Sequence, residues 1–156
     1  MSPGDDDRGD LRPSSAVGET GLLAILATLV ANEVEFLLVG GLAVGHHGYP
    51  RATKDIDIVP APDEGNLGKL WTALVELEAH QLSLGELRPQ ELPVTLSLEE
   101  LQRGANWDLS TIHGRLDVIQ YLEGALETPG DYERLRSGAV PGRYPFGTVW
   151  SPATTT

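Results

Sequence analysis

Apolar residues recur at two different spacings along the chain, and this change separates helices from strands. Between Glu19 and Ala31 they recur every three or four positions, which predicts a helix ending near Asn32. The apolar run from Glu35 to Val39 predicts a buried strand, and the Gly-Gly pair after it predicts a turn. Leu42 to His47 follows as a predicted short helix.

The second half of the chain begins with alternation over residues 55–59, which predicts a strand ended by two prolines. Asp63 is a predicted cap for a helix with one apolar face, formed by Leu67, Leu70, Trp71, Leu74 and Val75. Residues 83–93 predict a loop or a weakly paired strand. Ser97 and Glu100 fit a capping box for a short helix through Arg103.

Residues 107–112 and 115–121 predict two strands around a His113-Gly114 turn. After Gly124 the composition is rich in Gly, Pro and Arg, and only a short helix near residues 131–136 is predicted. The order of elements is that of an α/β protein with a small mixed sheet flanked by helices. The 156 residues fit one domain, with a disordered tail at 1–17, a core at 18–123 and a short extension at 124–156.

Composition narrows the classes of function. Hydrophobic residues make up 40% of the chain, which is globular, and no apolar run is long enough to span a membrane. The first ten residues lack the basic and apolar regions of a signal peptide, so we expect a cytoplasmic protein without a membrane partner. Cysteine is absent, which excludes disulfides and thiolate metal sites. The net charge of -12 and the absence of a basic patch argue against a protein that grips long nucleic acid.

Asp55 and Asp57 are candidate metal ligands. They stand two apart on a predicted strand, so both carboxylates point to one face while Ile56 and Ile58 point to the core. Neighbouring carboxylates repel unless a cation lies between them, and Mg²⁺ prefers such oxygen ligands together with phosphates. The alternative is a solvated strand edge, and the pair alone does not decide between the two.

Gly40-Gly41 is a candidate phosphate-binding turn. A strand that leads through two glycines into a helix lets backbone N–H groups approach phosphate oxygens, although an ordinary tight turn has the same sequence. Arg51, Thr53 and Lys54 precede the aspartate pair and are candidates for nucleotide binding, since Arg51 and Lys54 can neutralise triphosphate charge. Ordinary loop charges are the alternative for these residues.

Asp117 is the third acidic candidate, because a carboxylate between Leu116 and Val118 is costly unless it is paired or binds metal. Its alternative position is the exposed face of an edge strand. As a metal ligand it would also help to deprotonate an attacking hydroxyl. His46 and His47 have no third ligand nearby, so we assign them a structural or substrate-edge role rather than zinc binding.

Together these motifs resemble a known family. The segments Phe36–Ala43, His47-Gly48, Arg51–Ile58 and Gly114–Val118 are similar to those of minimal nucleotidyltransferases of the polymerase β superfamily, which include the bacterial AbiEii-type toxins. The resemblance covers residues 20–123 and implies a polymerase-β-like nucleotidyltransferase core. It also implies a bacterial toxin–antitoxin or phage-defence context, with a cognate toxin or antitoxin as partner.

The resemblance implies catalytic roles as well. Gly40 and Gly41 would hold the β- and γ-phosphates of an NTP such as ATP. Asp55, Asp57 and Asp117 would bind Mg²⁺ or Mn²⁺. The product would be NMP joined to a hydroxyl of an RNA (such as tRNA), a protein or a small molecule.

The chain also departs from the family. Relatives continue into a lysine-bearing helical part, whereas this chain has no lysine after Lys69, so the C-terminal helical part is expected to be missing. Apolar surface left uncovered there would favour a homodimer. The alternative function is therefore a non-enzymatic toxin–antitoxin partner, or a truncated pseudo-enzyme that keeps the fold.

Overall fold

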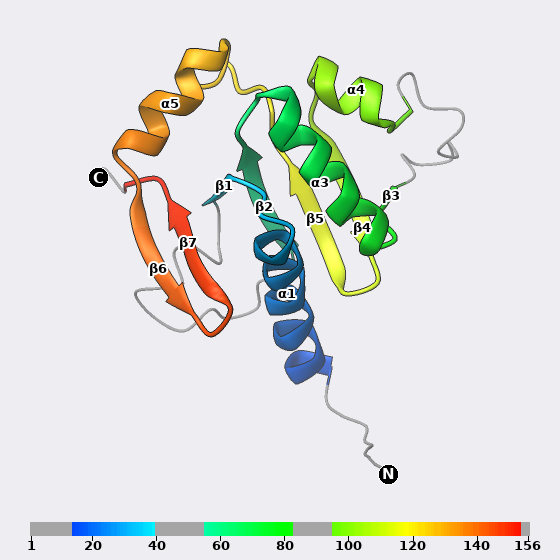
Figure 1. The fold of residues 1–156 in the computed structure, drawn as a ribbon. Coiled ribbons are helices and arrows are strands. Elements are labelled where there is room, and N and C mark those ends of the chain that lie inside the picture. The colour runs from blue at the N-terminus through cyan, green and yellow to red at the C-terminus, as the bar shows by residue number, and fades with distance from the viewer. Residues whose placement is uncertain (1–13, 40–54, 83–94, 154–156) are drawn as a thin grey trace.

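The computed structural model describes residues 14–39, 55–82 and 95–153, and of Ser14–Thr20 and Asp55 it describes the backbone alone. These residues form a mixed α/β fold in which helices flank one sheet (Figure 1). The helices in the described part are α1 (Ser14–Ala31), α3 (Glu64–Glu76), α4 (Leu98–Arg103) and α5 (Pro129–Ser137). The strands are β1 (Phe36–Val39), β2 (Asp55–Pro60), β3 (His80–Gln81), β4 (Trp107–Thr111), β5 (Gly114–Val118), β6 (Val140–Tyr144) and β7 (Gly147–Ser151).

The sheet has the order β3-β4-β5-β2-β1-β7-β6, with β2–β5 and β1–β7 parallel and the other neighbours antiparallel. The α/β class with a mixed sheet is therefore confirmed. The prediction of a small sheet was wrong, since seven strands take part. The additional strands are β3 and the β6–β7 hairpin, and the hairpin joins the core sheet through one pair, Leu37 with Trp150.

The helices divide between the two faces of the sheet. Helices α1 and α3 cover one face, where alternate residues of the central strands are fully buried: Leu38, Ile56, Ile58, Leu116 and Val118. Helix α5 packs on the other face over a second, smaller apolar cluster formed by Leu37, Val59, Ala61, Leu126 and Tyr132. The smaller cluster does not reach β4, and polar residues lie on that part of the face.

Two local contacts fix α1 and α3 against the sheet. Asp63 caps α3 by accepting a hydrogen bond from the Asn66 N–H at 2.9 Å, as predicted. The buried Asn66 amide donates to the carbonyls of Glu35 (2.8 Å) and Ala61 (3.0 Å), tying α3 to β1 and β2. At Gly21, α1 lies so close to the carbonyl of His113 that a Cβ would overlap with it.

Several sequence predictions differ from the structure in detail. Helix α1 begins at Ser14, inside the segment predicted as a tail, and residues 1–13 lie outside the described part. Val75 was predicted on the packed face of α3 but is 59% exposed. The Ser97 cap and the helix near Asp131 are confirmed as the starts of α4 and α5. No described helix is both long and apolar enough to cross a membrane.

Candidate active site

Three aspartates lie in one row across three neighbouring strands. Asp57 of β2 pairs in register with Asp117 of the parallel strand β5, and Asp117 pairs with Asp108 of the antiparallel strand β4. Side chains of directly paired residues point to the same face of a sheet, so these carboxylates share the face opposite α1 and α3. We call this set of Asp57, Asp117 and Asp108 the aspartate row.

Asp117 occupies the middle of the aspartate row, and the pKa of its carboxyl is raised to about 7. Burial is the largest cause, and the charges of Asp108 and Asp57 and a hydrogen bond with Asp57 act in the same direction. Arg115 lowers that pKa, but its guanidinium Nη2 is 3.9 Å from Asp117 Oδ1. Oδ1 is buried and has no hydrogen-bond partner in the described part of the chain. Strand β5 lies inside the sheet, so Asp117 is not on the edge strand that the alternative interpretation required.

The aspartate row fits a divalent cation in chemical terms. Carboxylate oxygens are the ligands that Mg²⁺ prefers, and a cation would relieve the repulsion between neighbouring acids. The buried Oδ1 of Asp117 accepts no hydrogen bond within the described residues, and the guanidinium of Arg115 lies 3.9 Å from it. Among the side chains described, no group of three His, Asp or Glu residues has the arrangement of a metal site. Asp55 is the third predicted ligand. The structure describes only its backbone, which pairs with Arg115.

The predicted phosphate-binding residues Gly40, Gly41, Arg51, Thr53 and Lys54 lie outside the described residues, as do His46 and His47. Val39, the last residue of β1, pairs with Asp57 in the antiparallel β1–β2 ladder. The chain therefore leaves β1 directly beside the aspartate row.

Asp108 was missed in the sequence, although a signal for it is present. Residues 112 and 113 form the two-residue turn of the β4–β5 hairpin, and Thr111 pairs with Gly114. Counting outward from this turn places Asp108 opposite Asp117. Asp108 also stands between the buried residues Trp107 and Leu109, so alternation predicts that it points away from the core.

The hydrogen bonds at the far end of the hairpin hold β4 and β5 in this register. Gln120 Oε1 accepts from the Ala105 backbone N–H at 2.8 Å and from Trp107 Nε1 at 3.1 Å. Its Nε2 donates to the carbonyl of Leu101 at 2.9 Å, which links the hairpin to α4. These hydrogen bonds hold β4 and β5, two of the three strands that carry the aspartate row, to each other and to α4.

Comparison with known protein families finds no family model that matches the chain, and comparison with curated proteins finds no significant match.

Proposed function

We propose that this protein is a metal-dependent nucleotidyltransferase that moves NMP from an NTP to a hydroxyl acceptor. The observation that carries the proposal is the register of Asp57 with Asp117 on adjacent parallel strands, next to the point where the chain leaves β1. Segments that are 60 residues apart in the sequence thereby contribute carboxylates to one place. The proposal includes a nucleotidyltransferase core of the polymerase β type, for which the sequence resemblance is the support.

The residues divide the chemistry between them. Asp57 and Asp117, together with Asp55, would hold Mg²⁺ or Mn²⁺, and the cation would supply positive charge against the triphosphate. Gly40 and Gly41 would hold the β- and γ-phosphates through their backbone N–H groups. The acceptor oxygen attacks the α-phosphorus, its proton passes toward Asp117, and pyrophosphate leaves.

The exposed carboxylate of Asp108, beside this site, affects which class of acceptor can bind. Asp108 is exposed at the β4 end of the aspartate row, and the whole chain carries a net charge of -12. Both features disfavour a long RNA acceptor, because phosphates bind where Lys and Arg gather. A protein or a small hydroxyl compound is therefore the acceptor class that we favour, and a basic partner protein would be needed for RNA.

The test combines binding with transfer. Calorimetry with Mg²⁺ and a non-hydrolysable NTP should show saturable binding, and labelled NTPs incubated with cell lysate should label an acceptor. Asp57→Asn should reduce labelling by at least about a hundredfold, since removal of one transition-state contact costs this much in enzymes. Asp63→Asn is the matched control, because asparagine caps a helix as well as aspartate does.

Equal labelling by wild type and Asp57→Asn would exclude the proposal. Binding of the nucleotide without any labelled acceptor would instead support a pseudo-enzyme that keeps the fold.

A further inference from the structure

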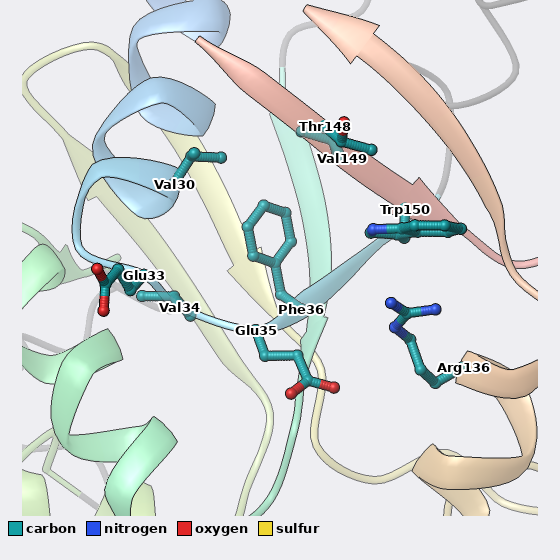
Figure 2. Close-up of a pocket in the computed structure, with 9 residues that line it drawn as sticks. All are labelled: Val30, Glu33, Val34, Glu35, Phe36, Arg136, Thr148, Val149 and Trp150. Carbon is teal, nitrogen blue, oxygen red and sulfur yellow. The ribbon is translucent and has the colours of Figure 1, made fainter.

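A second candidate site lies at the opposite end of β1 from the aspartate row. There, a cavity of 340 Å³ opens where β1 and β7 meet, between α1 and α5 (Figure 2). Val30, Val34, Phe36 and Val149 also line it, but the last three are buried in the main core beneath α1 and leave a ligand little apolar surface. We call it the β1–β7 cavity. Phe36 precedes Val39 by three residues, or about 10 Å along a strand, so this cavity is separate from Asp57.

Glu35 provides a carboxylate that is held in place at the cavity. Its backbone N–H donates to Asn66 Oδ1 at 2.7 Å, and its Oε2 accepts from the hydroxyl of Tyr132 at 3.2 Å. Tyr132 is 2% exposed, and burial and the Glu35 charge both raise its pKa, so it remains a hydrogen-bond donor. A carboxylate has about four acceptor positions, and the tyrosine occupies one of them.

Arg136 of α5 provides the opposite charge. Its guanidinium carbon lies 4.1 Å from the ring centroid of Trp150, so the face of the guanidinium stacks on the indole (Figure 2). A stacked guanidinium keeps its N–H donors at the edge, where they suit a carboxylate. No ion pair joins Glu35 to Arg136 among the described residues. The two opposite charges are therefore positioned by aromatic residues rather than neutralised by each other.

We propose that the β1–β7 cavity binds the two charged ends of a free amino acid. The ammonium group donates to Glu35 and the carboxylate accepts from Arg136, both on the face of the sheet that α5 covers. The volume is at the lower end of the range for small-molecule sites, which suits such a ligand. Glu33 and Glu35 both line the cavity and disfavour a polyanion such as a nucleotide.

The first experiment varies the ligand and leaves the protein unchanged. Calorimetry of the full chain with L-leucine and L-phenylalanine should show saturable binding of at least one of them. N-acetyl-L-leucine lacks the ammonium group and L-leucinamide lacks the carboxylate, so each should bind about tenfold or more weakly than leucine. No saturable binding of either amino acid, or equal binding of the blocked analogues, would overturn the proposal.

The second experiment varies the protein. Glu35→Gln keeps an acceptor for Tyr132 but removes the charge, and Arg136→Gln removes the guanidinium; each should weaken leucine binding about tenfold or more. Arg134→Gln is the matched control on the same helix, because Arg134 is 70% exposed and does not line the cavity. Asp57→Asn should bind leucine as wild type does. Unchanged binding in both Glu35→Gln and Arg136→Gln would refute the assignment, whatever the outcome of the nucleotide tests.

Discussion

Strands β2 and β5 present different chemistry on their two faces, although the residues of the two faces alternate along one backbone. Toward α1 and α3 the strands present Ile56, Ile58, Leu116 and Val118, all fully buried. The other face carries Asp57 and Asp117, whose like charges oppose each other across a parallel ladder. Burial of the apolar face stabilises the fold, and part of this stability offsets the repulsion between the carboxylates on the acidic face.

The largest expected effect is loss of the apolar face. Ile58→Ala removes a fully buried side chain between Leu38 and Val118 and should lower the free energy of unfolding by about 2–5 kcal/mol. Asp57→Asn, one residue away, should change it by less than about 1 kcal/mol. Urea denaturation of both variants measures the difference. Equal losses would show that the two faces are not separable in this way.

The second effect tests how closely α1 approaches the sheet. Gly21→Ala introduces a Cβ that overlaps with the carbonyl oxygen of His113, so it should cost about 1–3 kcal/mol. Gly68→Ala is the control, because Gly68 lies in α3 with open space around its Cβ position. That change should stabilise the protein by about 0.5–1 kcal/mol, as alanine favours a helix. A neutral Gly21→Ala would mean that α1 can shift freely on the β4–β5 turn.

The third effect concerns pH. The pKa of Asp117 rises from 3.8 to about 7 on folding, so between these pH values the native state binds more protons than the unfolded state. The free energy of unfolding therefore falls as pH rises through this window. Asp117→Asn removes this dependence and should be more stable than wild type at pH 8, on the order of 1 kcal/mol, but not at pH 4.

Thermal denaturation at both pH values measures this difference. Added Mg²⁺ at pH 8 should narrow it by stabilising the wild type alone. A variant less stable than wild type at pH 8 without metal would contradict the repulsion described for the aspartate row.

The smallest effect lies on α3. Val75→Glu should change the free energy of unfolding by less than about 0.5 kcal/mol, because Val75 is 59% exposed. Leu74→Ala, its neighbour at 1% exposure, should cost about 2–5 kcal/mol. Similar losses in the free energy of unfolding, measured in urea, would show that Val75 lies on the packed face that the sequence pattern predicted.

Periodicity in the sequence is enough to predict the elements around the aspartate row. Alternation identifies β2, β4 and β5, and helical spacing with a capping aspartate identifies α3. The pairing of Asp57 with Asp117 is not predictable from spacing, because the two strands are parallel neighbours that belong to distant segments. Asp108 is the exception, since a two-residue turn fixes its position opposite Asp117.

The β6–β7 hairpin and the β1–β7 cavity were not predictable in the same way. The segment Val140–Tyr144 contains proline and glycine, which disfavour a strand locally, and its pairing with β7 overrides this preference. Glu35 and Arg136 are 101 residues apart in the sequence, and they line one cavity only because β7 pairs with β1 and α5 packs beside them. Such long-range contacts leave no periodic trace in the sequence.

Pro141 lies in β6, the outermost strand beyond β7, where it pairs with Trp150. Proline lacks the N–H that an incoming strand would need, so it interrupts the row of donors that the outer side of β6 could offer. The other edge of the described sheet, β3, has only two residues. Neither edge of this sheet is therefore a good template for pairing with a strand of another chain. Pro141→Thr should make the protein more prone to aggregation during refolding.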